Sequence, residues 1–350
     1  MKSSFRLTEA SDMHLPAYDN TALVAVSTCP VWGITRYRMH KRMPTQGRAT
    51  ALECGTAMHE VFAFVRLMTL KYQLDEVQGE IAFRHHGERL FGAERLLHLR
   101  NEIIGSENVV EASKRGAIAV LDTSGYYDEP RDKRRTLVNM EESALAYINR
   151  WQFQHHVWMR DPTDPTSDVG IEWPFDMVVT LGDRVFRHTG RIDGIHHRAD
   201  RITLHDNKTA SRLNDAWAMS FETSSQVTAY CVAASLYTQE LVNSAEIHGL
   251  AIPMPKSYDY GGIVVAYVSR ETHQYERWLN WLDYTVALCE KYEGNPYDAP
   301  MFTHSCNRYF RPCSMIPFCA SDREEQELII SQMEVDEWSP LTEDKDTVDG

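Results

Sequence analysis

The sequence lacks a long uninterrupted apolar run, although 43% of its 350 residues are hydrophobic. Because a helix that crosses a bilayer needs about 20 consecutive apolar residues, the sequence predicts no membrane-spanning segment. Residues 1–20 are polar and lack the apolar stretch of a secretory signal peptide. We therefore expect a cytoplasmic protein that is long enough to bury a large core.

A positive net charge is also missing. The chain carries −14 at pH 7, which by itself disfavours a nucleic-acid partner. The negative charge is unevenly placed, because residues 322–350 contain 11 acidic and 2 basic residues and so hold −9 of the total. Basic residues gather in residues 36–48 and 131–135. Local basic surface matters more for phosphate binding than the sum over the chain, so DNA stays a candidate partner unless both groups are only solvated faces.

Hydrophobic periodicity predicts alternating helices and strands. Apolar residues at three- and four-residue spacing indicate a helix over residues 55–71, and a mostly helical polar stretch follows at 75–160. Strands are expected at 171–180, 184–195, 201–207 and 262–268, and further helices at 222–240 and 271–291. This order is typical of an α/β fold in which helices cover a sheet.

Two adjacent predicted strands carry three charged residues that could act together. Asp193 lies in one strand, and Asp206 and Lys208 lie in the next. Two carboxylates can hold a hard divalent cation, and a neighbouring lysine can orient water or neutralise charge on a reacting phosphate. If the strands pair, the three side chains meet at one edge of the sheet, as metal-assisted cleavage of a phosphodiester requires. The alternative is an exposed cross-strand ion pair, a frequent feature of sheets.

Residues elsewhere in the chain could complete this site. Gln226 and Tyr230 are four residues apart and share one helix face, where an amide and a phenol can hydrogen-bond a phosphate or a base edge. His59 offers a nitrogen ligand, and Glu172 offers another carboxylate. Each also has a simpler interpretation, as part of an ordinary helix face, as a packing histidine or as a surface residue of a strand.

The order of these motifs resembles the RecB-like branch of the PD-(D/E)XK nuclease superfamily. The matching patterns are Gly55-x-x-x-His59, Gly190-x-x-Asp193, Asp206-x-Lys208-Thr209 and Gln226-x-x-x-Tyr230, with Glu172 as the acidic residue that opens the first core strand. The resemblance covers residues 27–60 and 170–320. It implies a restriction-endonuclease-like α/β core, in which helices flank a central mixed sheet. It further implies one nuclease domain at residues 1–320, with its core at 27–74 and 165–320, a helical insertion at 75–160 and an acidic tail at 321–350.

The resemblance also implies a role for each of these residues. The metal ligands for Mg²⁺ or Mn²⁺ would be His59, Asp193, Asp206 and the backbone carbonyl of Asn207. The metal would activate a water molecule and withdraw charge from the scissile phosphate. Lys208 would position that water and stabilise the developing negative charge. Gln226 and Tyr230 would place the DNA strand.

The implied activity is that of a metal-dependent deoxyribonuclease, and in particular an exonuclease, in DNA recombination, repair or phage DNA processing. One alternative is a non-catalytic DNA-binding or assembly subunit that keeps the fold and docks a protein partner through the acidic tail. The other alternative is a nuclease that acts on RNA.

Four cysteines resemble the ligands of a cofactor. Cys29, Cys306, Cys313 and Cys319 are similar to the cysteines of the iron–sulfur subgroup of the same nucleases, as in AddB-type and CRISPR-adaptation enzymes, which implies a [4Fe–4S] cluster. The sequence departs from the subgroup between its second and third cysteines, where six residues replace the usual two. An odd total of seven cysteines in a cytoplasmic protein also argues for metal ligation over disulfides.

Other interpretations of the cysteines stay open. Zinc on the same four thiolates is the main rival, and free buried thiols are the simplest alternative. Cys54 or His304 could replace one ligand. Cys231 and Cys289 lie among apolar residues and are expected in the core.

Overall fold

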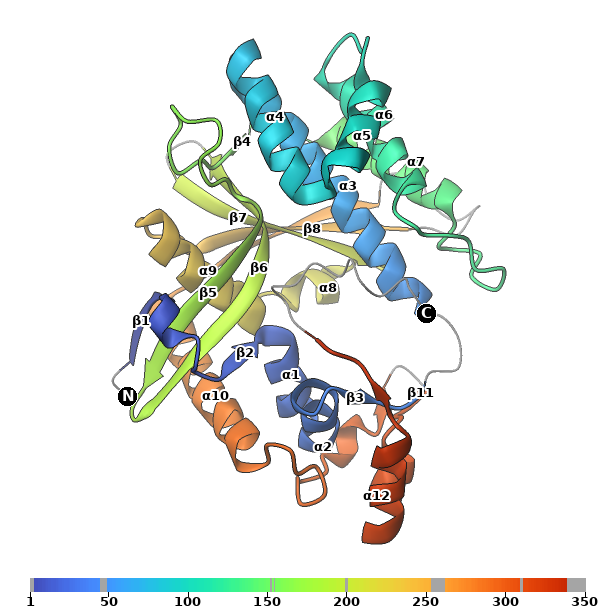
Figure 1. The fold of residues 1–350 in the computed structure, drawn as a ribbon, viewed down its shortest axis with the longest axis vertical. Coiled ribbons are helices and arrows are strands. Elements are labelled where there is room, and N and C mark those ends of the chain that lie inside the picture. Colours follow the sequence, from blue (N-terminus) through green and yellow to red (C-terminus); the bar gives the residue numbers. More distant parts are fainter. Residues whose placement is uncertain are drawn as a thin grey trace. The chain divides into compact units, whose positions relative to one another are not determined.

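The computed structural model describes residues 3–44, 49–151, 153, 155–198, 201–252, 262–308 and 311–338 (Figure 1). Its fold is mixed α/β, with a mixed sheet and many helices, which confirms the predicted fold class. The chain divides into two compact units. The first unit comprises Met1–Arg48, Pro174–Arg191 and Thr272–Gly350, and the second comprises Ala49–Trp173 and Ile192–Glu271. Two long strands, β5 (Ile171–Leu181) and β6 (Arg184–Arg198), have residues in both.

The second unit contains the strands that carry the predicted charged residues. The last part of β6 pairs antiparallel with β7 (Arg201–Ala210), from Gly194↔His205 to Arg198↔Arg201. β7 pairs parallel with β8 (Ser244–Ala251), and β8 pairs antiparallel with β9 (Ile263–Ser269). A parallel pair needs a crossover connection, which here contains α8 (Asp215–Met219) and α9 (Ser225–Thr238). The short β4 (His156–Val157) pairs with the end of β6.

Five consecutive helices complete this unit. They are α3 (Thr50–Gln73), α4 (Glu76–Phe91), α5 (Ala93–Ile103), α6 (Val109–Asp122) and α7 (Leu137–Arg150). α3 packs against α4, α6 and β7, and Figure 1 shows it lying among the other helices of this group. Residues 61–70 of α3 are all buried, as expected of a helix with neighbours on several sides. Side chains of Asp75, Asn108 and Thr136 cap the first turns of α4, α6 and α7.

The first unit has shorter elements. β1 (Ser3–Leu7) pairs antiparallel with the end of β5, and β2 (Ala17–Asp19) pairs parallel with β6. α1 (Asn20–Thr28) packs against α10 (Thr272–Lys291). The remaining elements are η1 (Ala10–Asp12), α2 (Pro30–Gly33), the π-helical η2 (Ile34–Arg38), β3 (Lys41–Arg42), η3 (Thr303–Ser305), β10 (Asn307–Arg308), β11 (Arg311–Pro312), α11 (Ile316–Ala320), α12 (Arg323–Gln332) and β12 (Glu334–Val335).

Two features depart from the sequence analysis. β8 was not expected, because its apolar residues alternate with Glu246 and His248, which read as an exposed face although Glu246 is buried. The acidic segment after residue 320 contains α12, whose end contributes buried Ile330 and Met333 to an apolar cluster with Phe318. Residues 339–350 of the expected acidic tail lie outside the described residues.

Candidate active site

The structure brings the predicted site residues into one unit, although they come from five separate elements. They are His59 on α3, Glu172 on β5, Asp193 on β6, Asp206, Asn207 and Lys208 on β7, and Gln226 and Tyr230 on α9. Hydrogen bonds, ion pairs and electrostatic interactions connect most of them.

Asp193 is held from two sides. Its Oδ2 accepts a hydrogen bond from the backbone N–H of Asn207 at 2.8 Å and lies 3.3 Å from Nδ1 of His59. Burial raises the pKa of Asp193, but the charges of His59 and Lys208 outweigh burial and hold that pKa below its usual value. The carboxylate form is therefore favoured, and this is the form that binds a cation.

Asp206 and Lys208 form an ion pair within β7, because residues two apart in a strand face the same side of the sheet. Nζ of Lys208 lies 3.0 Å from Oδ1 and 2.9 Å from Oδ2 of Asp206. Asp206 is only 3% exposed, so the exposed cross-strand ion pair considered from the sequence is wrong. Burial raises the pKa of Asp206, while the carboxylates of Asp206 and Asp193 outweigh burial and raise the pKa of Lys208. The lysine is thus held as an ammonium group beside two carboxyl groups.

Three residues present a set of donors for a hard cation. Ligand atoms of His59, Glu172 and Asp193 all lie within 4.8 Å of one another. One imidazole with carboxylate oxygens suits Mn²⁺ as well as Mg²⁺, so these residues fit the metal that the sequence analysis expects. Asp206 lies outside this group of three, but its charge interacts with that of Asp193. The geometry therefore supports Glu172 as a metal ligand more strongly than the sequence pattern did.

The backbone at Glu172 is unusual and is held by a helix of the predicted insertion. Glu172 has φ 43°, a left-handed conformation that costs a non-glycine residue energy and tends to occur at functional sites. Arg89 on α4 donates to the carbonyl oxygens of Ile171 at 2.7 Å and of Glu172 at 3.4 Å. The helical stretch between the motifs thus supports the position of a candidate metal ligand.

Arg66 is a site residue that the sequence analysis missed. Its guanidinium group is buried on α3 and donates through Nη2 to the side-chain carbonyl of Asn207. The amide nitrogen of Asn207 donates to Oη of Tyr147 at 3.1 Å. Gly194 leaves room for this contact, because a Cβ there would lie 2.6 Å from Nε of Arg66. The available signal was a single arginine within the apolar stretch of the helix.

Gln226 and Tyr230 interact along one face of α9, as their spacing predicts. Nε2 of Gln226 donates to Oη of Tyr230 at 2.8 Å. Burial, together with the charges of Asp206 and Asp193, raises the pKa of Tyr230 well above its usual value. Tyr230 is therefore a neutral phenol near the two carboxyl groups, and a neutral phenol can donate a hydrogen bond.

The four cysteines of the expected cluster all belong to the first unit. Burial raises the pKa of Cys319 to about 11, with further contributions from Cys29, Cys313 and Cys306. The backbone N–H of Cys313 donates to the carbonyl of Cys306 at 2.8 Å. Within the described ranges, however, no three cysteines bring their sulfur atoms within 4.8 Å of one another.

Cys54 and His304, the possible replacement ligands of the cluster, lie in different units. Cys54 is buried in α3 of the second unit, and His304 lies in η3 of the first unit. Cys231 and Cys289 are buried, which confirms their expected place in the core.

Comparisons with known proteins give a family match over most of the chain. The family model described as the PD-(D/E)XK nuclease superfamily matches residues 20–320. The search of curated proteins found no match. A solved structure titled "Crystal structure of SSO0001" is similar at 14% identity and a TM-score of 0.25, over 34% of this chain and 49% of that one, so the match spans about half of that protein.

Among the helices that the structure describes, none is both long enough and apolar enough to cross a membrane.

Proposed function

Because this chain belongs to the PD-(D/E)XK nuclease superfamily, we propose that it is a metal-dependent deoxyribonuclease, and in particular an exonuclease. The proposed active site consists of His59, Asp193, Asp206 and Lys208, with Glu172, Gln226 and Tyr230 beside them. The proposed pathways are DNA recombination, repair or phage DNA processing. The observation that carries the proposal is the ion pair between buried Asp206 and half-buried Lys208 next to Asp193. Burying carboxyl groups is costly, and two of them close together suit a cation.

We assign the metal to His59, Asp193 and Glu172, with Asp206 and the carbonyl of Asn207 as further ligands. A bound Mg²⁺ or Mn²⁺ supplies charge neutralisation at the phosphate and a lower pKa for water. The His59 ring contacts Asp193 and thereby orients its carboxylate. A carboxylate held in place by hydrogen bonds loses little freedom on binding a cation, which favours affinity.

Lys208 stabilises negative charge in this proposal and does not act as a base. The carboxylates favour its ammonium form, and an ammonium group can neutralise charge that develops on a phosphate. Tyr230 donates from its neutral phenol, and Gln226 fixes the phenol through the 2.8 Å hydrogen bond. These two residues would place the phosphate backbone of the DNA relative to the metal.

A cleavage assay tests the proposal. End-labelled linear single- and double-stranded DNA, circular DNA and RNA of the same sequence are incubated with the protein in Mg²⁺ and in Mn²⁺. We expect release of short products from the ends of linear DNA and no cleavage of circular DNA. Cleavage of the circle would make the enzyme an endonuclease, and preference for RNA would replace the DNA assignment.

A matched pair of variants ties the activity to the site. Lys208→Met removes the ammonium group of the site, whereas Lys71→Met removes another half-buried lysine of the same unit, which pairs with Glu80 at 2.8 Å. We expect Lys208→Met to lose cleavage and Lys71→Met to retain it. Equal cleavage by the two variants would mean that the activity does not depend on Lys208. DNA binding without cleavage by the wild type would favour a non-catalytic DNA-binding or assembly subunit.

We also propose a [4Fe–4S] cluster on Cys29, Cys306, Cys313 and Cys319. Three facts support it: the four residues belong to one unit, their charges act on Cys319, and Cys29 and Cys313 line one cavity of about 210 Å³. Protein purified without oxygen should contain iron and sulfide, and Cys313→Ser should lose them whereas Cys289→Ser should not. Zinc without iron would assign the same thiolates to zinc, and neither metal would leave them as free thiols.

A further inference from the structure

A second group of potential ligands lies on the opposite side of β7 from Asp206. His205 precedes Asp206, so its side chain points to the other face of the strand. The ring of His205 is 1% exposed, and neither of its nitrogens makes a hydrogen bond. Burying polar atoms without hydrogen bonds is costly, so this histidine calls for a physical explanation.

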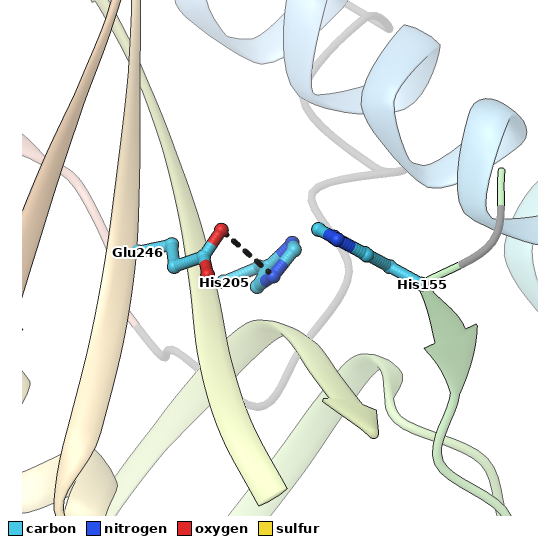
Figure 2. A group of neighbouring side chains, drawn as sticks. All are labelled: His155, His205 and Glu246. Atoms are coloured by element: carbon cyan, nitrogen blue, oxygen red, sulfur yellow. Dashed lines mark ion pairs between the residues drawn. The ribbon is translucent and has the colours of Figure 1, made fainter. Parts of the chain in front are cut away.

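Two other residues direct ligand atoms toward His205. Glu246 is its partner in the parallel register of β7 and β8, and His155 comes just before β4. Ligand atoms of His155, His205 and Glu246 all lie within 4.8 Å of one another. Figure 2 shows the three side chains pointing toward one another, with a dashed line for the ion pair between Glu246 and His205. In that pair Oε2 of Glu246 lies 3.5 Å from Nε2 of His205.

The distances match the edges of a metal coordination shell better than they match hydrogen bonds. In a tetrahedral site with metal–ligand bonds of about 2.0–2.1 Å, neighbouring ligand atoms are about 3.3 Å apart. Oε2 of Glu246 lies 3.5 Å from Nε2 of His205 and 3.5 Å from Nε2 of His248, which is two residues along β8. Two imidazoles and one carboxylate form a ligand set found in zinc sites that keep an open position.

A purely structural role accounts less well for the group. Besides His205, buried His196 and half-buried His248 each have an inaccessible Nε2 without a hydrogen bond. A hydrogen-bonded polar network would satisfy these atoms. Stacking of the His196 and His205 rings, with centroids 4.0 Å apart, accounts for their packing but not for their nitrogens.

Two neighbouring arginines affect this group: Arg198 orients the carboxylate of Glu246, and the charge of Arg66 limits the affinity for a dication. An imidazole binds a metal through an unprotonated ring nitrogen, and neither nitrogen of His205 is engaged in a hydrogen bond. Arg198 pairs with Oε1 of Glu246 and so orients the carboxylate with Oε2 toward His205. Burial lowers the pKa of His205, the buried guanidinium group of Arg66 lowers it further, and the charge of that group repels a dication in the same way. We therefore expect weaker binding than at a site made of cysteine thiolates.

A cavity gives this group access to solvent. It has a volume of about 370 Å³, and its lining includes His155, Glu246 and His248. Arg150 and Tyr267 also line it, so its walls are partly cationic and aromatic. An ion could enter through this cavity, and its remaining coordination position would face the cavity.

We propose that His155, His205 and Glu246 bind a divalent transition metal of the zinc class, with one coordination position open to the cavity. His248, whose Nε2 lies 3.5 Å from Oε2 of Glu246, is a further possible donor. This site shares no residue with the proposed nuclease site, so it does not depend on the proposed function.

The test is a measurement of bound metal in three variants. Glu246→Gln and His155→Gln remove ligands, and His156→Gln is the matched control because His156 is the exposed neighbour of His155. Each full-length protein is stripped with chelator, dialysed against Zn²⁺ and analysed for zinc. We expect about one fewer zinc ion per chain in both ligand variants and the wild-type content in His156→Gln. Unchanged zinc content in the ligand variants would overturn the proposal.

A cobalt spectrum, measured together with thermal unfolding, distinguishes loss of this metal site from misfolding. Co²⁺ bound by nitrogen and oxygen in a tetrahedral site gives visible absorption without the charge-transfer bands of thiolates, so it distinguishes this site from the cysteines. We expect wild type and His156→Gln to give this spectrum and Glu246→Gln to lose it, while all three proteins still unfold cooperatively when heated in chelator. Persistence of the spectrum in Glu246→Gln would overturn the proposal.

Discussion

The two faces of the strand β7 carry chemically different side chains. One face carries Asp206 and Lys208, a charged pair beside Asp193, and the other face carries His205 and Asn207, which contact neutral rings and the guanidinium group of Arg66. The first face offers hard oxygen ligands that suit Mg²⁺ or Mn²⁺, whereas the second offers imidazole nitrogens that suit zinc. Alternation along a strand thus places two kinds of candidate metal site on consecutive residues.

Asn207 connects the two faces. Its backbone N–H donates to Asp193 on the acidic side, while its side chain contacts Arg66 and Tyr147 on the other side. A change on one face can therefore reach the other through this residue, and variants can test how separate the two faces are.

The largest expected effect is on catalysis. Asp206→Asn keeps the shape of the side chain but removes its charge, so we expect nuclease activity to fall by on the order of 10²–10³-fold. The rate of product release from labelled linear DNA at saturating Mn²⁺ measures this. Zinc content at the histidine face should stay at the wild-type value, and its loss would mean that the two faces do not bind metal independently.

The acidic face could be predicted from the sequence, and the histidine face could not. Periodicity places Asp206 with Lys208 on one face of a strand and Gln226 with Tyr230 on one face of a helix. The resemblance to the nuclease superfamily then joined these pairs with Asp193. His155, His205 and Glu246 lie on segments far apart in the chain, and only the parallel register of β7 with β8 brings two of them together. Because β8 was not anticipated, that register could not be predicted. The contact of Arg66 with Asn207 depends in the same way on how α3 packs on β7.

The second expected effect is a pH dependence of stability that arises from His188, a buried histidine outside both groups of candidate metal ligands. His188 in β6 is fully buried, and burial lowers its pKa to about 4. The pKa is lower in the folded state than in the unfolded state, so the stabilisation is complete above about pH 6.5 and is lost as the pH falls toward 4. At about 1.4 kcal/mol per pH unit, the loss reaches about 3 kcal/mol.

Urea unfolding at several pH values measures this effect. His188→Phe should remove this part of the pH dependence, whereas His197→Phe, at an exposed position of the same strand, should leave it unchanged. Zinc should not alter the unfolding midpoint through His188, since His188 belongs to neither group of candidate metal ligands found among the described residues. Identical pH profiles for wild type and His188→Phe would contradict the prediction.

The third expected effect is stabilisation by zinc. A ligand that binds only the folded state adds about 2.7 kcal/mol when its concentration is 100 times the Kd. The thermal midpoint of the stripped protein should therefore rise with Zn²⁺, and the rise should be smaller in Glu246→Gln than in His156→Gln. Equal shifts in these two variants would place the stabilising zinc elsewhere, at the cysteines or the acidic face.

The smallest expected effect tests the packing that joins the two faces. At Gly194 a Cβ would lie 2.6 Å from Nε of Arg66 and 2.9 Å from Nε2 of His196, so Gly194→Ala should destabilise the protein by about 1–3 kcal/mol. At Gly55 in α3, the nearest atom to a Cβ is Oγ1 of Thr209 at 3.6 Å, so Gly55→Ala should stabilise the helix by up to about 1 kcal/mol. Chemical unfolding of the two variants measures both changes. The same substitution thus has opposite effects on stability at two glycines of this unit. Destabilisation of similar size in both variants would mean that contact with Arg66 is not what requires glycine at position 194.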